Sequence, residues 1–279
     1  MRRLDPRLEQ RLVKVLLWAM TLATVFVLLY IVLFILLRGL PVLSVSFLTE
    51  NPHDMGKSGG IFPTIVGTLA LTAMALLVAV PLGVGTAVYL TEYTWENRLT
   101  RVIRFGADCL AGIPSIIFGL FGFILFVLKL GFGWSILSGG LTLAFMVLPT
   151  IIRTSEEALR SVPRSYREVS TSLGSTKWQM VTRVVLPSAL PGIVTGVILS
   201  VGRSIGETAA VIFTAGSSLR LPTSLFSSSR TMSVHFYILA REGISMPNAY
   251  GTAAVLVIAI LAVNIITYRL MHRFIRKYS

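Results

Sequence analysis

Two charged residues, Arg203 and Glu207, follow a long uncharged stretch, Val184 to Gly202. Residues four apart share one face of a helix, and a rise of about 1.5 Å per residue carries both side chains deep into an apolar layer. A charge at the centre of a bilayer costs about 2.5–3.5 kcal/mol and usually faces a bundle interior, where it serves a pathway. We therefore predict that Arg203 binds an anion and that Glu207 weakens this binding enough to allow release. An ion pair that merely joins two helices is the alternative.

A second set of residues, Glu168, Gly174, Leu186 and Pro187, lies in the polar stretch just before that run. Pro163 favours a helix start, and Gly174 suits the residue after a helix, which often has positive φ. Thr176 and Gln179 then match a capping box that opens another short helix. The pattern predicts a helix-turn-helix with a fixed angle, which could transmit the movement of a partner. An ordinary amphipathic hairpin at the surface is the alternative.

The elements that hold these residues are predicted to be membrane-spanning helices. The chain has 279 residues, of which 54% are hydrophobic and only 13% charged, far outside soluble usage. A bilayer core about 30 Å thick requires about 20 apolar residues per helix. Six stretches are free of Lys, Arg, Asp and Glu: Val15–Leu37, Ser58–Thr91, Cys109–Leu128, Leu130–Ile152, Val184–Gly202 and Gly243–Tyr268. We predict an all-α polytopic membrane protein with six transmembrane helices.

Glycine and proline refine these spans. The second helix is expected over residues 64–90 as a tightly packed core helix, and the fourth is expected to start late because Gly131, Gly133 and Gly139-Gly140 open its stretch. Pro114 predicts a kinked, buried third helix. The first helix is bulky on all sides and is expected to face lipid, whereas the single cysteine, Cys109, is expected to pack in the core.

The net charge of +13 is unevenly distributed. Basic residues gather in 2–14, 98–104, 153–183 and 269–277, which are alternate connections of a six-helix chain. The positive-inside bias then places both termini and these loops in the cytoplasm, with 38–62 and 215–249 outside. In the second outer segment, Thr231 to Arg241 reads as a short helix ended by Gly243, and we expect its His235 to be an interfacial polar contact rather than a metal ligand.

The polar stretch resembles the EAA loop of ABC-importer permeases. Glu168, Gly174 six residues later, and Val184-Val185-Leu186-Pro187 are in that register, between the fourth and fifth spans. Val169-Ser170 replaces two alanines, and Val184 replaces the usual isoleucine. The resemblance implies a type I importer permease core whose loop docks on a separate ATP-hydrolysing subunit, with Glu168, Gly174, Leu186 and Pro187 as coupling residues. The chain has no nucleotide motif, so it is expected to be a transport subunit and not an enzyme.

The segment Gly202 to Ala210 is similar to the Arg-x-x-Gly-Glu-Thr signature of phosphate-importer permeases, and Thr231 to Tyr237 is more similar to the A type of the two permeases. The resemblance covers about residues 61–270. It implies a permease domain over 61–272, with a coupling loop at about 153–187. We expect residues 1–60 to hold a tail, the first helix and an outer loop, and 273–279 to form a basic cytoplasmic tail.

The implied solute is inorganic phosphate, and the implied location is the cell inner membrane. The implied partners are a homologous second permease, two ATP-binding subunits, a periplasmic or extracellular phosphate-binding protein and membrane lipid. No nucleic acid, metal or cofactor is expected in this chain. An importer of phosphonate, sulfate or molybdate remains open as an alternative, as does a secondary phosphate carrier, which would show inverted repeats. A membrane assembly factor is a third possibility, but it would have no need of Arg203 in the bilayer.

Overall fold

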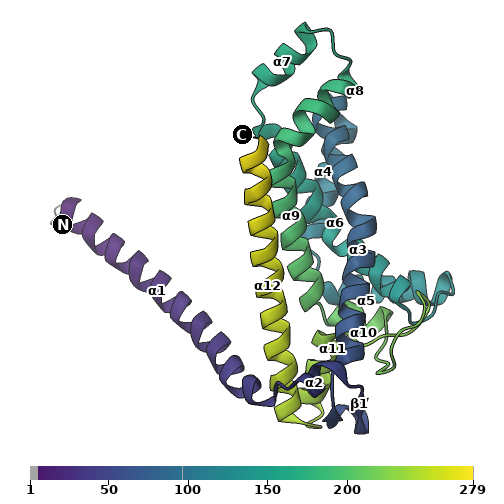
Figure 1. Ribbon diagram of the computed structural model, residues 1–279. Helices are drawn as coiled ribbons and strands as arrows, with labels where there is room; N and C mark the ends of the chain where they lie inside the picture. The colour runs from purple at the N-terminus through teal and green to yellow at the C-terminus, as the bar shows by residue number, and fades with distance from the viewer. Residues whose placement is uncertain (1–5, 96, 279) are drawn as a thin grey trace.

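A computed structural model describes residues 6–95 and 97–278 of the chain. Its main elements are long helices, and all of these except the first lie roughly along one direction in a bundle (Figure 1). The long helices are α1 (Pro6–Gly39), α3 (Phe62–Val88), α6 (Ile136–Ser161), α9 (Leu186–Gly206) and α12 (Met246–Tyr278). The predicted late start of the fourth span is confirmed, since α6 begins at Ile136 with Ser135 as its N-cap.

Short elements occupy the two ends of the bundle. One end carries 3₁₀ turns η1 (Leu40–Val42) and η2 (Asp54–Gly56), helices α2 (Val45–Thr49), α10 (Ala209–Thr214) and α11 (Met232–Arg241), and a hairpin of β1 (Pro52–His53) and β2 (Ser58–Gly59). The other end carries α7 (Arg164–Ser172) and α8 (Lys177–Met180) (Figure 1). The two-residue strands do not alter the predicted all-α class, and α11 matches the helix predicted over 231–241.

Within the described residues, five helical segments are long and apolar enough to cross a membrane, and a bent pair of helices makes a sixth if the pair counts as one span. The bent pair consists of α4 (Arg98–Ala111) and α5 (Ser115–Gly122), which continues as the π-helical η4 (Phe123–Lys129). Counted in this way, the six predicted spans are recovered. α12 ends at the same end of the bundle as α7 and α8, so the two segments predicted to be cytoplasmic lie on one side, and which side this is stays a prediction (Figure 1).

The third span differs from its prediction. The chain breaks at Pro114 as predicted, but the break is a 104° bend between α4 and α5 rather than a kink within one buried helix. Pro114 has an extended ψ of 141° and begins α5 as its N-cap. α4 is amphipathic, with Leu99, Val102 and Phe105 exposed. Cys109 is also exposed, so its predicted core position is wrong: α4 turns its apolar side outward instead of into the bundle.

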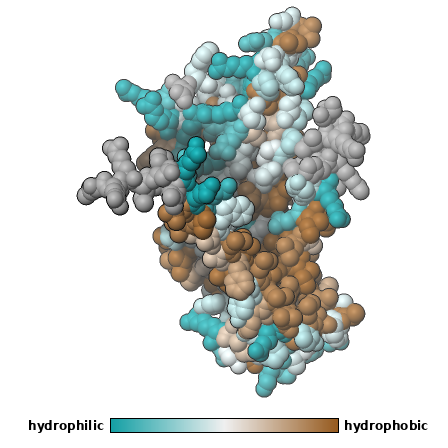
Figure 2. Space-filling model, turned by 90° about the vertical axis from the view of Figure 1, so that its left-hand side faces the viewer, coloured by the Kyte–Doolittle hydropathy of each residue, from teal (hydrophilic) through white to brown (hydrophobic). Residues whose placement is uncertain are grey.

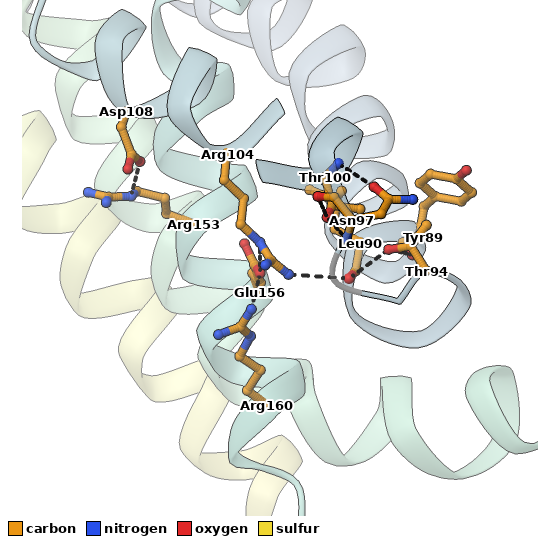
Figure 3. Close-up of polar contacts among 10 residues, drawn as sticks. All are labelled: Tyr89, Leu90, Thr94, Asn97, Thr100, Arg104, Asp108, Arg153, Glu156 and Arg160. Atoms are coloured by element: carbon orange, nitrogen blue, oxygen red, sulfur yellow. Dashed lines mark hydrogen bonds and ion pairs between the residues drawn. The ribbon is translucent and has the colours of Figure 1, made fainter. Parts of the chain in front are cut away.

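Ion pairs hold the inner side of α4 against α6. The Arg104 guanidinium lies 2.8 Å from the Glu156 carboxylate, which also pairs with Arg160 at 2.7 Å, and Arg153 pairs with Asp108 at 2.8 Å (Figure 3). Arg104 also donates to the Leu90 carbonyl at 3.4 Å. These polar contacts tie α4 to α6 and to the chain just beyond α3.

The core lies between α3 and α6, as the small residues of the second span predicted. Leu71, Ala75 and Ala79 of α3 pack with Leu143 and Val147 of α6, and all are almost fully buried. Close approach needs glycine here, because a Cβ at Gly140 would overlap Met74 and one at Gly83 would overlap Ile151. Such close contacts are typical of helices that pack in membranes.

α1 slants away from the bundle and meets it only near its C-terminal end (Figure 1). There Gly39 packs against the backbone of Tyr250 and the side chain of Ala254 in α12. The most apolar window of α1 is not buried at all inside the chain, which agrees with the prediction that this helix faces lipid. An apolar belt separates two hydrophilic ends of the molecule (Figure 2).

Candidate functional site

The loop between α6 and α9 folds as the predicted helix-turn-helix. α7 ends at Ser172, and Gly174 has a φ of +80°, a left-handed conformation that glycine adopts at little cost. The Thr176 hydroxyl accepts from the Gln179 N–H at 3.3 Å while the Gln179 side chain accepts from the Thr176 N–H at 3.0 Å, which completes the predicted capping box. The angle between α7 and α8 is thus fixed by local geometry.

The second arm of the loop runs into the membrane helix without a break. α8 passes through a π-helical segment, η5 (Val181–Val185), into α9, and the whole run from Lys177 to Gly206 forms one candidate span. Met180, Val181 and Val185 are buried with Ala87 of α3 and Leu159 of α6. A displacement of α8 would therefore move the first half of α9 directly.

The predicted coupling residues lie around this loop but do not form one cluster. Glu168 is exposed on α7, and Leu186 is half-buried against the apolar cluster that includes Val185. Pro187 is exposed near the junction of η5 and α9. Exposed apolar side chains also gather on the loop, with Leu173 82% and Trp178 66% exposed. Such a surface suits docking of a protein partner.

The structure corrects the predicted arrangement of Arg203 and Glu207. α9 ends at Gly206, and Glu207 is its C-cap in an extended conformation with ψ of 131°. Its Oε1 accepts from the N–H groups of Thr208 and Ala210, both at 3.2 Å, and so caps the start of α10. Because Glu207 lies beyond the last helical residue, it does not share a helical face with Arg203 as predicted. Within the described residues no ion pair joins the two.

Arg203 is exposed near the end of α9, although its neighbours Ser204 and Ile205 are almost fully buried. A Cβ added at Gly202 or Gly206 would meet nothing within 4 Å, whereas one at Gly192 or Gly196 would overlap α6. Close packing within the described residues therefore requires glycine in the first half of α9 but not at these two positions of the second half. The surface around Arg203 is open.

Sequence reasoning missed two polar groups. One is the pair formed by Glu92 and Arg167, which are 75 residues apart and share no local pattern. The other is Arg230, which is 5% exposed, donates to the Ser217 carbonyl at 2.8 Å and lies 3.4 Å from Nδ1 of His235. The predicted polar contact of His235 is therefore confirmed, but it is buried and not interfacial, since His235 is 1% exposed. The spacing of five residues between Arg230 and His235 follows no local pattern that would predict their contact.

His235 predicts an acid-sensitive fold. Burial, helped by the charge of Arg230, lowers the pKa of His235 from 6.5 to about 4. Between these values the unfolded chain binds the extra proton, so stability is complete above pH about 6.5 and falls as the pH drops toward 4, by about 3 kcal/mol in all. His235→Gln, which keeps an acceptor but cannot titrate, is expected to flatten this loss in thermal unfolding of the purified protein.

His53→Gln is the matched control, because His53 is exposed. It is expected to retain the acid sensitivity of the unmodified chain. An equal loss of stability in the His235 variant between pH 6.5 and 4 would contradict the assignment.

A comparison with known proteins gives consistent matches. The profile of a family described as "Binding-protein-dependent transport system inner membrane component" matches residues 79–279. The probable ABC transporter permease protein YqgI of Bacillus subtilis is 36% identical over 247 residues, which cover 82% of this chain and 84% of that protein. The phosphate transport system permease protein PstA 1 of Mycobacterium tuberculosis is 38% identical over 211 residues, covering 75% and 69%.

Another phosphate transport system permease, PstA of Haemophilus influenzae, is 31% identical over 236 residues and covers 83% of both chains. Among solved structures, a bacterial ABC transporter for import of alginate superposes with a TM-score of 0.67 at 18% identity, covering 96% of this chain and 99% of that one. The inward-facing MetNI methionine ABC transporter gives a TM-score of 0.60 at 21% identity, covering 77% and 94%. The two structures support the fold alone.

Proposed function

The chain belongs to the family of binding-protein-dependent transport system inner membrane components, and we propose that within this family it serves an importer of inorganic phosphate. It is a multi-pass permease subunit of an ABC transporter and not an ATPase, since ATP hydrolysis in such transporters belongs to other subunits. The observation that carries the choice of solute is Arg203. Its guanidinium stands exposed on the open part of α9 with no carboxylate paired to it in the described residues.

Phosphate suits such a site because guanidinium groups bind its oxygens through two parallel charge-assisted hydrogen bonds. Glu207, half-buried and engaged in capping α10, leaves Arg203 free of direct competition. In contrast to the role predicted from the sequence, Glu207 contributes a negative charge at the site and stabilises the turn after α9. It does not pair with Arg203. Similarity to permeases named for phosphate transport supports the same solute.

The proposed mechanism joins the two ends of α9. Closure of the two ATP-binding subunits displaces α7 and α8, and the unbroken run from Lys177 to Gly206 carries that displacement toward Arg203. The exposed apolar residues of the loop and Glu168 face the ATP-binding partner. The other proposed partners are a second, homologous permease that completes the passage, and a phosphate-binding protein that docks at the end formed by the hairpin and α11.

Uptake of labelled phosphate by proteoliposomes that contain the co-purified complex tests this function. We expect uptake to require ATP and the binding protein, and to be displaced by unlabelled phosphate but not by phosphonate, sulfate or molybdate. Displacement by one of those anions at equal concentration would reassign the solute. Uptake driven by an ion gradient in the absence of ATP would instead identify a secondary carrier and refute the proposal.

A further inference from the structure

The cytoplasmic end of α3 holds the coupling loop through a buried ion pair. Beyond α3 the chain forms a π-helical segment, η3 (Tyr89–Tyr93), which carries Glu92. The Arg167 guanidinium of α7 straddles the Glu92 carboxylate, with Nη2 at 2.6 Å from Oε1 and Nε at 3.2 Å from both oxygens. The side chain of Glu92 is 5% exposed and that of Arg167 is 21% exposed. Arg167 immediately precedes Glu168 of the coupling loop.

Arg167 also fixes α7 relative to the end of α6. Its Nη1 donates to the Val162 carbonyl at 2.8 Å, and its Nη2 donates to the Leu159 carbonyl at 2.9 Å. One planar guanidinium thus joins η3, the last turn of α6 and α7. The rigid fork of donors makes this geometry specific to arginine, because a lysine ammonium could not satisfy all three acceptors in their present positions.

The adjacent residue of η3 contacts the other arm of the loop. The Lys177 ammonium lies 5.3 Å from the centre of the Tyr93 ring, within the range of a cation–π interaction. Glu92 and Tyr93 therefore contact α7 and α8 respectively. Neither arm can shift far without breaking a contact to the end of α3 or moving it.

The opposite end of α3 packs against the outer segment at residues 229–232. The Thr68 hydroxyl accepts from the Met232 N–H at 2.9 Å, at the start of α11. Gly67 packs against Ser229 and the carbonyl of Arg230 so closely that no side chain would fit. A helix of 27 residues spans about 40 Å, so α3 connects the coupling loop with the segment that carries Arg230 and His235.

We propose that Glu92 is a positioning residue for the coupling loop, and that α3 forms a second route by which movement of the loop reaches the outer end. This inference rests on the proposed coupling role of the loop, and adds a route that α9 does not supply. A buried ion pair contributes little net stability over an apolar pair, but it fixes geometry, and loss of one partner leaves the other charge buried and uncompensated. Glu92 therefore fixes the position of Arg167, and with it that of α7, rather than adding much stability.

Glu92→Gln in the purified complex with its ATP-binding subunits tests the proposal. We expect the variant to retain basal ATP hydrolysis within about twofold but to lose stimulation by the phosphate-loaded binding protein about 5- to 150-fold, the range of coupling between protein sites. Hydrogen–deuterium exchange of the α7 amides is expected to accelerate, because the carbonyl-bound guanidinium loses its anchor. This exchange measurement does not depend on the identity of the solute.

Glu156→Gln is the matched control. Glu156 is also a largely buried carboxylate at this end of the molecule, but its ion pairs among the described residues join it to Arg104 of α4 and Arg160 of α6 rather than to α7 (Figure 3). It is expected to keep both stimulation and slow exchange in α7. Equal stimulation and equal exchange in the two variants would overturn the proposal. If the Glu92→Gln variant fails to assemble, Glu92→Asp replaces it, because aspartate keeps the charge on a side chain shorter by one methylene. This variant must show weaker stimulation and faster α7 exchange to a smaller degree. Unchanged stimulation and exchange would overturn the proposal.

Thr68→Val tests the outer end of the route. It removes the acceptor of the Met232 N–H with little change of shape, and we expect lower stimulation with α7 exchange unchanged. Full stimulation would overturn the route along α3. If ATP hydrolysis by the wild-type complex were stimulated only by a binding protein loaded with another solute, the phosphate assignment would be refuted. The role of Glu92 would still be tested, because stimulation of the variant relative to the wild type could be measured with that solute.

Discussion

Arg203→Gln is expected to lower ATP-driven phosphate uptake by about 10- to 150-fold in the fully assembled complex. A hydrogen bond to a charged group contributes about 1.5–3 kcal/mol, which corresponds to that range in rate. Because Arg203 is exposed and takes part in no ion pair among the described residues, its loss should leave the fold intact. Labelled phosphate uptake in proteoliposomes, with co-purification of the ATP-binding subunit as the check on assembly, measures the effect.

Two variants bracket this result. Arg203→Lys keeps the charge but loses the fork of donors, so uptake should fall between the wild type and the glutamine variant. Arg220→Gln removes another exposed arginine, in the outer segment, and should change uptake by less than about twofold, as expected for a screened surface charge. Wild-type uptake by an assembled Arg203→Gln complex would remove Arg203 from the pathway and leave the solute assignment resting on similarity alone.

Gly174→Pro is expected to uncouple hydrolysis from uptake. Proline holds φ near −65°, whereas Gly174 has a φ of +80°, and its N–H donates to the Thr171 carbonyl at 3.0 Å. The turn must rearrange, so the angle between α7 and α8 changes. The buried apolar cluster around Val181 and Val185 of η5 remains. We expect uptake to fall at least tenfold, a barrier change of about 1.4 kcal/mol, while the ATP-binding subunit still co-purifies.

Milder substitutions at Gly174, and one at Gly106, separate the effect of backbone conformation from the effect of a steric clash. A Cβ at Gly174 would meet nothing within 4 Å, so Gly174→Ala tests conformation alone and should cost about 1–2 kcal/mol locally. Gly174→Asn should be milder, since asparagine tolerates positive φ better. Gly106→Ala, at an equally open position inside α4, should have no effect on coupling. Retained coupling in the Gly174→Pro complex would contradict the fixed-angle account of the loop.

Features that depend on neighbouring residues could be predicted from the sequence. The capping box at Thr176 and Gln179, the positive φ of Gly174 and the break at Pro114 follow from local backbone chemistry. Long apolar runs likewise located the core helices α3 and α6 and their glycine contacts. The lipid-facing character of α1 followed from its uniform bulk.

Features that depend on tertiary contacts could not be predicted in the same way. The end of α9 was misplaced because periodicity alone extends a helix through Gly206, whereas Glu207 is captured by the N–H groups of α10. The Glu92–Arg167 pair joins residues 75 positions apart, and no local pattern connects them. Cys109 followed the apolar run in sequence, but the 104° bend turned its helix outward. The domain boundaries and the roles of the site residues stay predictions.

The open surface of α9 has a consequence for how this protein can change over evolutionary time. A Cβ placed at Gly202 or Gly206 would have no neighbour within 4 Å, so the described residues leave open space on the glycine side of this part of α9. In the proposed importer, the second permease lies opposite this surface. A substitution here that admits a different anion would work only if the opposite surface of the second permease were compatible with it. We therefore expect solute specificity to change through paired substitutions in the two permeases rather than through this chain alone.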